Sequence, residues 1–313
     1  MKALILSGGG SKGAFTGGML EYMKLVMKKE YDLYISTSTG TLLQSLASIN
    51  DFDALKEGYT SIGLDDIYKI NPFSSKSTID KTKINVLSVG RMYLLEHEPT
   101  FGDSSNLKDL IKKFFPKEKY IKSLESGKTL ISCVTNLSKI QSEYYSSKIL
   151  GSDGYDEFCD WTWISCNAVP FTSLVRRGLD NDYYADGGFM EHMPICKAIL
   201  EGATEIDAIS TMTEFYVNKP LEIGRNPLTL VSRLFEVFLR NAAQIDIDRA
   251  KELAKNRDVI LNIYYVPRML TENSLYFDKE VMSKWWDEGY NHIKTLNESE
   301  LANCKTIKLN KNI

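Results

Sequence analysis

The chain has 313 residues, of which 43% are hydrophobic and 25% are charged, a composition that excludes a disordered or collagen-like chain. Its length lies near the size at which a single hydrophobic core stops growing, which predicts one large domain or a core domain with a substantial insertion. A formal net charge of −3 supplies no overall basic field, so nucleic acid is not expected as a partner.

The N-terminal pattern alternates strands and helices. Residues 2–7 form a short apolar run that predicts a buried strand, and three glycines then open a helical pattern over 12–29. A second strand is expected at 33–37, followed by a helix at 41–49. Two successive strand–turn–helix units are typical of parallel strands joined by crossover helices, so we expect an α/β fold.

The remaining pattern fits one domain with a helical insertion. Residues 51–126 are mostly helical in pattern, most clearly at 53–59, 83–95 and 106–115, and are interpreted as an insertion or cap. There is no repeat or flexible linker, so residues 1–313 are expected to form a single domain, with 226–313 packing on the core as C-terminal helices and a last strand. The other expected strands are 128–135, 140–145, 183–185, 205–211 and 259–266, and the other expected helices are 155–168, 194–201, 228–254 and 279–296.

The sequence also bears on the compartment. An unbroken run of only four apolar residues, 3–6, precedes the first glycine, which is too short for a signal peptide, and no run approaches the length of a membrane span. The five cysteines form no C-x-x-C pair, and their odd number favours reduced thiols over a disulfide framework. We therefore expect a cytoplasmic protein.

Three glycine-marked turns carry the candidate chemistry, and the first is GGGSKG. It follows a strand and opens a helix, so its backbone amides are suited to bind an anion. It fits the dinucleotide pattern G-x-G-x-x-G, but the next strand ends in Ser and Thr without an acidic residue for a ribose, and no Walker A sequence is present. The alternatives are a phosphate cradle, an oxyanion hole or a simple tight turn. The residues are Gly8, Gly9, Gly10, Ser11, Lys12 and Gly13, of which Lys12 is either an electrostatic helper or a side chain packed on the helix.

The second turn is YISTSTGTLL, residues 34–43. It resembles the nucleophile elbow G-x-S-x-G, in which the nucleophile lies on a strained turn between strand and helix and small residues flank it. Gly40 satisfies the rear position, and Ser36 replaces the front glycine. Ser38, between Thr37 and Thr39, is therefore the candidate nucleophile, whereas the motif alone also fits an ordinary polar loop.

The third turn is Asp186-Gly187-Gly188, which follows a short expected strand. A strand that ends in aspartate can place a carboxylate at the edge of the sheet beside a nucleophile from another strand. The alternative is a structural Asx turn. In this order, the three turns resemble the motifs of the patatin-like phospholipase family, and the segment SCNAVPF (165–171) also looks like a segment of that family.

The resemblance implies a three-layer α/β/α fold and a Ser-Asp dyad formed by Ser38 and Asp186, with amides around Gly9, Gly10 and Ser11 receiving the oxyanion. Asp186 would work best as a base if it were partly desolvated and hydrogen-bonded to Ser38. A triad would need a histidine, and the chain has only three: His97, His192 and His292. For His192, just past the third turn, we expect a hydrogen-bonded structural role rather than proton transfer.

These inferences predict a serine lipid acyl hydrolase of the phospholipase A or lysophospholipase type. The alternatives are an acyltransferase with the same dyad and an inactive or nucleotide-binding scaffold. The expected partner is a lipid or another acyl ester, with peripheral membrane contact and without a metal or cofactor. Trp285 and Trp286 are adjacent on one helix, so one of them is expected to face away from the core.

Overall fold

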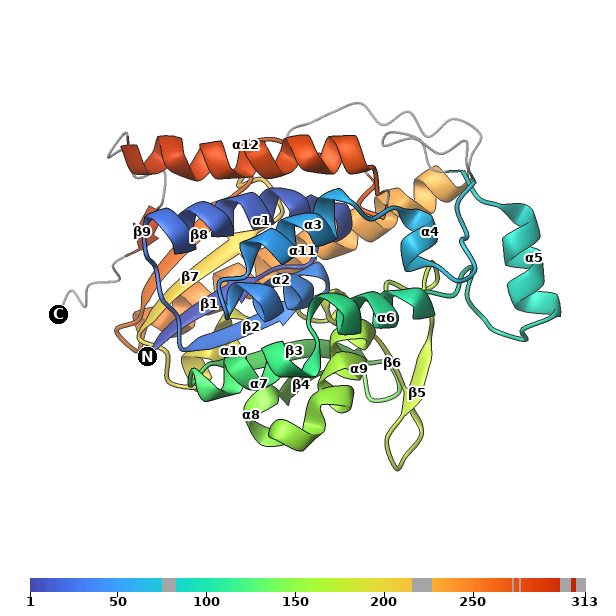
Figure 1. Cartoon of the computed structure of the whole chain (residues 1–313), viewed down its shortest axis with the longest axis horizontal. Helices are drawn as coiled ribbons and strands as arrows, with labels where there is room; N and C mark the ends of the chain where they lie inside the picture. The colour runs from blue at the N-terminus through green and yellow to red at the C-terminus, as the bar shows by residue number, and fades with distance from the viewer. Residues whose placement is uncertain (75–82, 216–226, 272, 276, 299–304, 308–313) are drawn as a thin grey trace.

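The computed structural model describes residues 1–74, 83–215, 227–271, 273–275, 277–298 and 305–307. These residues build a nine-stranded sheet with helices on both faces (Figure 1). The strands are β1 (Lys2–Leu6), β2 (Leu33–Thr37), β3 (Thr129–Asn136), β4 (Gln141–Ser146), β5 (Val175–Arg177), β6 (Asp182–Asp186), β7 (Glu205–Ser210), β8 (Ile260–Tyr265) and β9 (Lys305–Ile307).

The helices of the described chain lie between these strands almost throughout, as crossover connections require. They are α1 (Gly13–Glu21), α2 (Thr39–Ala47), α3 (Phe52–Thr60), α4 (Leu64–Ile67), α5 (Val86–Leu94), α6 (Ser105–Phe114), α7 (Lys117–Glu125), α8 (Ser147–Leu150), α9 (Tyr155–Ser165), α10 (Ile195–Leu200), α11 (Pro227–Lys255) and α12 (Lys279–Glu298). Short turns of other helical types are η1 (Gly10–Lys12), η2 (Tyr22–Val26), η3 (Ser152–Gly154) and η4 (Gly187–Phe189).

The centre of the sheet is parallel. β1 pairs in parallel with β2 and β7, β2 pairs with β3, and β7 pairs with β8. The antiparallel strands β4, β5, β6 and β9 lie outside this central group. The mostly parallel sheet and the three-layer fold expected from the sequence are therefore confirmed.

Two strands meet end to end along one edge of β3. β2 pairs with β3 up to Thr37, which lies opposite Cys133, and β6 pairs with the next part of β3 from the other direction, with Asp186 opposite Val134. β4 pairs with both parts of β3, so it occupies the other edge of that strand. Because β2 and β6 run toward each other, the residues at their C-terminal ends meet at the same point of the sheet.

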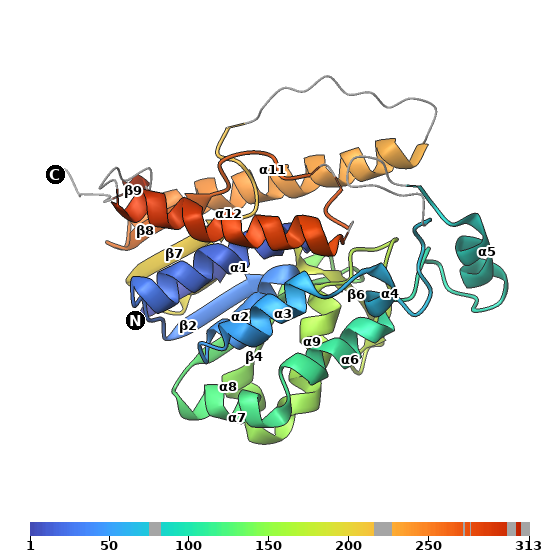
Figure 2. The ribbon, with the colours of Figure 1, turned by 45° about the horizontal axis from the view of Figure 1, so that its top comes forward.

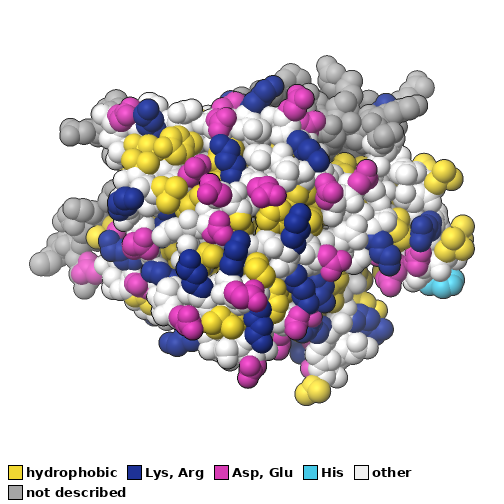
Figure 3. All heavy atoms as spheres, viewed as in Figure 1, with side chains coloured by type: hydrophobic (Ala, Val, Ile, Leu, Met, Phe, Trp, Pro, Cys, Tyr) yellow, Lys and Arg dark blue, Asp and Glu magenta, His cyan; other side chains and the backbone are white. Residues whose placement is uncertain are grey.

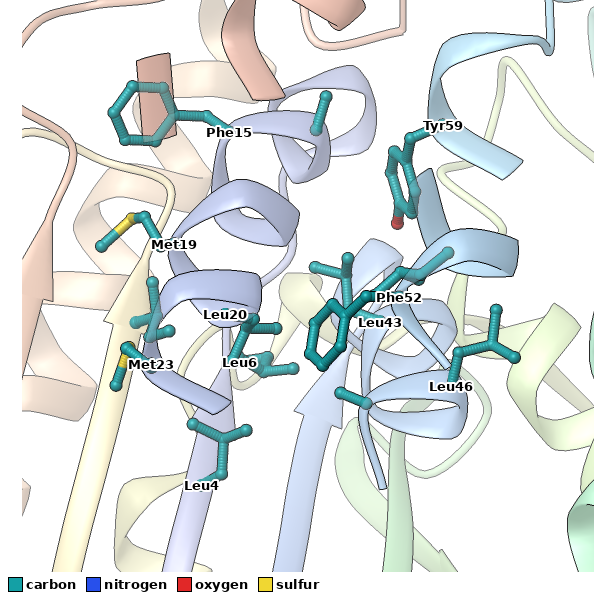
Figure 4. Packing of buried hydrophobic residues seen from close by; sticks show 14 of the residues in the cluster. Leu4, Leu6, Phe15, Met19, Leu20, Met23, Leu43, Leu46, Phe52 and Tyr59 are labelled. Carbon is teal, nitrogen blue, oxygen red and sulfur yellow. The ribbon is translucent and has the colours of Figure 1, made fainter. Parts of the chain in front are cut away.

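The alternation of side chains along β1 divides the core into two layers. Leu4 and Leu6 face α1, α2, α3 and α12, as the close-up of this layer shows (Figure 4), whereas Ala3 and Ile5 face α10 and α11. A strand that is buried on both faces is apolar at consecutive positions, which explains the run ALIL. Each fully buried leucine or isoleucine contributes about 1.5 to 3 kcal/mol to the free energy of unfolding.

Helix α12 lies along α1 in both ribbon views (Figures 1 and 2). Trp285 is 4% exposed and Trp286 is 0% exposed, so the expectation that one of them faces away from the core was wrong. The reason is that α12 contacts both α1 and α3, which together cover more than one stripe of the helix. The Trp286 indole also donates a hydrogen bond to Glu21, 2.6 Å away.

The segment 51–126 contains α3 to α7. α3 and α6 pack against the rest of the fold, whereas α5 projects at one end of the molecule in both views (Figures 1 and 2). The expected helix at 83–95 starts later, at Val86, where the side chain of Asn85 caps it. The short elements α4, α7, α8, β5 and β9 were not predicted. None of the described helices combines the length and the apolar character that a membrane-spanning helix needs.

Candidate active site

Ser38 lies on the turn between β2 and α2 with a strained backbone, φ 53° and ψ −130°. Such positive φ values are rare outside glycine and are typical of a nucleophile elbow. The Ser38 carbonyl accepts hydrogen bonds from the amide and hydroxyl of Thr41, at 2.8 and 2.7 Å, and the Ser38 amide donates to the Ser165 hydroxyl at 2.9 Å. These hydrogen bonds thus hold the backbone of Ser38, a residue that is 9% exposed, in a fixed position.

Gly40 is required by the close approach of α2 to β1. A Cβ atom at this position would lie 2.5 Å from the carbonyl oxygen of Leu6, and backbone cannot move aside cheaply. We expect Gly40→Ala to lower the free energy of unfolding by about 2 to 4 kcal/mol, because it forces overpacking at a buried backbone contact. Gly90→Ala is the matched control, since a Cβ there meets nothing within 4 Å and alanine favours the helix. Urea unfolding of both variants tests this, and equal stabilities would contradict it.

Asp186 ends β6 opposite this elbow. Its carboxylate accepts a hydrogen bond from the amide of Gly188 at 2.8 Å, and the side chain of Ser38 lies close to it. Burial raises the pKa of Asp186, which is 5% exposed, to about 6, although the Ser38 side chain and the Gly188 amide act to lower it. The structure thus places Ser38 and Asp186 together, and it places Gly187 where any side chain would collide with the Cys133 carbonyl.

The end of α9 and the residues that follow it connect the two strand ends. The Ser165 hydroxyl accepts from the Ser38 amide and donates to the Cys133 carbonyl at 2.6 Å, while the Asn167 carbonyl accepts from the Asp186 amide at 2.8 Å. The segment SCNAVPF resembles a segment of the patatin-like phospholipase family, but its hydrogen bonds to β3 and at the ends of β2 and β6 were not predicted. No local pattern marks them, because each joins residues far apart in the chain.

The glycine loop Gly8 to Gly13 lies beside the elbow. Gly9 has φ 153° and Gly10 has φ 53°, and a Cβ at Gly9 would lie 2.5 Å from the hydroxyl oxygen of Thr211. Within the described chain, the amides of Gly9 and Gly10 donate no hydrogen bond. The amide of Ser11, by contrast, donates to the carbonyl of Ser274 at 2.9 Å. Ser11 is therefore not a free oxyanion donor here, contrary to the sequence-based expectation.

Lys12 is held by an ion pair rather than by packing alone. Its ammonium lies 2.8 Å from Glu236 on α11, and the pair is largely buried. The other oxygen of Glu236 accepts from the Ser274 hydroxyl at 2.7 Å. The residues Glu236 and Ser274, which were not predicted, therefore hold the loop from the outside.

A cavity of about 130 Å³ opens beside Ser38 and Asp186. Most of the side chains that line it are apolar, and they come from α2, α3, α4, α6, α11 and α12. Gly8, Gly9 and Gly10 also reach it, so the cavity joins all three glycine-marked turns. Its apolar lining residues include Leu42, Leu46, Leu55, Ile111, Phe115 and Met282.

His192 also lines this cavity, at 1% exposure. Neither ring nitrogen has a hydrogen-bond partner in the described residues, so the expected hydrogen-bonded structural role of its side chain was wrong. Burial, together with the nearby charge of Lys12, lowers the pKa of His192 to about 3. His97 and His292 lie elsewhere and do not line the cavity. Among the described residues, no group of His, Cys, Asp and Glu side chains could hold a metal ion.

Comparison with known proteins bears on this arrangement. Among solved structures, the crystal structure of VipD from Legionella pneumophila is similar, with a TM-score of 0.47 and 16% sequence identity over 95% of this chain and 67% of that chain. No curated protein matches. A family model described as patatin-like phospholipase matches residues 4–199, which include the glycine loop, Ser38 and Asp186. Because this match spans more than half of the chain, the protein belongs to the patatin-like phospholipase family.

Proposed function

We propose that the protein is a serine lipid acyl hydrolase of the phospholipase A or lysophospholipase type, with Ser38 as nucleophile and Asp186 as its base. Membership of the family supports a lipid hydrolase or esterase activity. The observation that carries the finer proposal is the closeness of the Ser38 side chain to the buried Asp186 carboxylate at the wall of an apolar cavity. Hydrolysis of acyl esters by the wild-type chain and by its Ser38 and Asp186 variants tests it.

The reaction follows from the positions of these groups. The Asp186 carboxylate takes the proton of Ser38 while Oγ attacks the ester carbon, and the amides of Gly9 and Gly10 stabilise the oxyanion. The bond to the alcohol oxygen then breaks, and that oxygen receives the proton from Asp186. Water attacks the acyl-enzyme by the same route in reverse, so Ser38 is regenerated and a carboxylic acid is released. An apolar cavity favours an acyl chain over the nucleotide alternative.

The acyl chain is proposed to lie along α2. Ser38, which immediately precedes α2, lines the cavity together with Leu42 and Leu46, whose spacing of four residues places them on one face of that helix. Eight residues of helix span about 12 Å, so Leu46 lies well away from the reacting carbonyl. Residues of the segment 51–126, including Leu55 and Ile111, also line the cavity. We propose that this insertion is a wall of the substrate site within one domain.

Leu46→Trp is expected to shorten the acyl chain that the cavity accepts. The larger ring fills the far part of the cavity, so kcat/KM for a sixteen-carbon acyl ester should fall at least about 10-fold relative to a four-carbon ester. Steady-state kinetics with matched p-nitrophenyl esters measure this ratio. Leu46→Met is the control, because it conserves volume and should leave the ratio unchanged. A Leu46→Trp enzyme with an unchanged ratio would place the acyl chain elsewhere.

The peripheral membrane contact stays a prediction. On the face shown in Figure 3, positive and negative side chains are intermixed, and hydrophobic side chains gather on the projecting part that contains α5. Val86, Leu87 and Leu94 of α5 are largely exposed, as is Phe238 of α11. The residues Phe235 and Leu239 beside Phe238 line the cavity. These exposed apolar residues supply a surface for a lipid bilayer, which co-sedimentation with vesicles would detect.

A further inference from the structure

The side chain of His192 is a buried imidazole without a partner. Both its nitrogens lack hydrogen bonds within the described chain although the residue is almost completely buried. Buried polar atoms of native proteins are nearly always paired, and each unpaired one costs about 1 to 3 kcal/mol. A ring with two such atoms at the wall of the substrate cavity is therefore a candidate to bind a group that arrives with the substrate.

The ring is fixed between two glycines of the site. A Cβ atom at Gly8 would lie 3.1 Å from Cε1 of His192 and 3.0 Å from Cβ of Ser38. A Cβ atom at Gly188 would lie 3.1 Å from Nδ1 of His192 and 3.1 Å from Oδ1 of Asp186. The imidazole thus lies against the two glycines that are next to Ser38 and Asp186, and Nδ1 is the ring nitrogen nearer to both, since it would also lie 3.4 Å from the Cβ at Gly8.

The backbone around the ring is anchored separately. The amides of His192 and Met193 both donate to the same carboxylate oxygen of Asp246 on α11, at 2.7 and 2.9 Å. Asp246 therefore holds the main chain and leaves the ring itself unpaired. This arrangement keeps the ring in position while both buried nitrogens stay without a partner among the described residues.

We propose that His192 is a further catalytic residue, whose Nδ1–H donates a hydrogen bond to the alcohol oxygen of the ester as that oxygen leaves the acyl carbon. The inference rests on the proposed function. The departing oxygen must come to Asp186 to receive the proton taken from Ser38, and Nδ1 lies beside that carboxylate. When the bond between the acyl carbon and the alcohol oxygen breaks, its electron pair stays on the oxygen, and the hydrogen bond stabilises this charge until Asp186 returns the proton.

His192 takes no proton in this scheme. Burial and the charge of Lys12 keep its pKa near 3, so the ring stays neutral at pH 7 and acts only as a hydrogen-bond donor. The acidic groups near the ring are engaged elsewhere. Asp186 accepts from the Gly188 amide, and Asp246 accepts from the His192 backbone. The carboxylate of the preceding residue, Glu191, accepts from the Tyr144 hydroxyl.

A comparison of esters with different leaving groups tests this role of His192. An alkyl alcohol is a poor leaving group and needs this hydrogen bond, whereas p-nitrophenolate carries its negative charge without help. We expect His192→Phe to lower kcat/KM about 10- to 100-fold with an alkyl ester and less than about 3-fold with the p-nitrophenyl ester of the same acid. His192→Asn keeps an N–H near the position of Nδ1 and should stay within about 5-fold of wild type with both esters.

The thermal midpoint separates this role from a structural one. Phenylalanine removes two unpaired polar atoms and keeps a flat ring between the glycines, so His192→Phe should unfold at or above the wild-type temperature. If His192→Phe does not fold, His192→Leu replaces it in the same comparison. Equal losses with both esters, or no loss with the alkyl ester, would overturn the inference. Absence of any Ser38-dependent turnover of the p-nitrophenyl ester would instead overturn the proposed function.

Discussion

Ser38→Ala is expected to lower kcat for acyl ester hydrolysis by at least about 10³-fold while the fold stays intact. Removal of the nucleophile of a serine hydrolase leaves only the background that substrate binding and oxyanion stabilisation provide. The loss should appear in kcat rather than in KM, because the cavity that binds the acyl chain is unchanged. Initial rates with a short-chain p-nitrophenyl ester measure the effect.

Ser152→Ala is the matched control for this variant. Ser152 is an exposed serine in the short turn η3, outside the cavity, so its removal should leave kcat and KM at wild-type values. Circular dichroism and the thermal midpoint of both variants check that each is folded. A Ser38→Ala protein that retains more than about a tenth of the wild-type rate would move the nucleophile to another residue.

Asp186→Asn is expected to lower kcat by about 10³-fold and to remove the acid limb of the pH profile. Only the ionised carboxylate can accept the Ser38 proton, and burial raises its pKa to about 6. The wild-type rate should therefore rise with pH through about 6 and level off above about 7. Rates between pH 4.5 and 8.5 for both proteins test this, and a wild-type profile with no change near pH 6 would contradict it.

The same substitution should affect stability in the opposite direction. The folded-state pKa of Asp186 is raised above its unfolded value of about 3.9, so the native state binds the proton more tightly and its stability falls as the pH rises from about 4 to about 6. Asparagine carries no charge, so it removes this pH-dependent loss of stability. At pH 8 we expect Asp186→Asn to have a free energy of unfolding about 1 to 3 kcal/mol higher than wild type, measured by urea unfolding.

Much of the fold could be predicted because its signals are local. The apolar run of β1, the turn residues around Ser38 and the helical spacing of α1 are each contained in a few consecutive residues. Gly40 marked a close approach of strand and helix, and the structure places it against the Leu6 carbonyl. Two such units in succession were enough to indicate a parallel sheet.

The features that could not be predicted depend on distant residues. Ser11 and Ser274 are 263 residues apart, so nothing near GGGSKG shows that the Ser11 amide is engaged. The burial of Trp285 beside Trp286 depends on where α3 lies against α12. The expectation that the His192 ring is hydrogen-bonded was wrong. A short sequence pattern reveals neither how deeply a ring is buried nor that Asp246 binds the backbone of His192 instead of its ring.

The central claim is that Ser38 is activated by Asp186, and the site of fluorophosphonate labelling tests it most directly. Such a probe reacts with an activated serine and forms a stable adduct that mass spectrometry can locate. We predict a single adduct on Ser38 in the wild-type chain and very slow labelling of Asp186→Asn. An adduct on another serine, or a rate of labelling at Ser38 that does not change when Asp186 is replaced, would contradict the account.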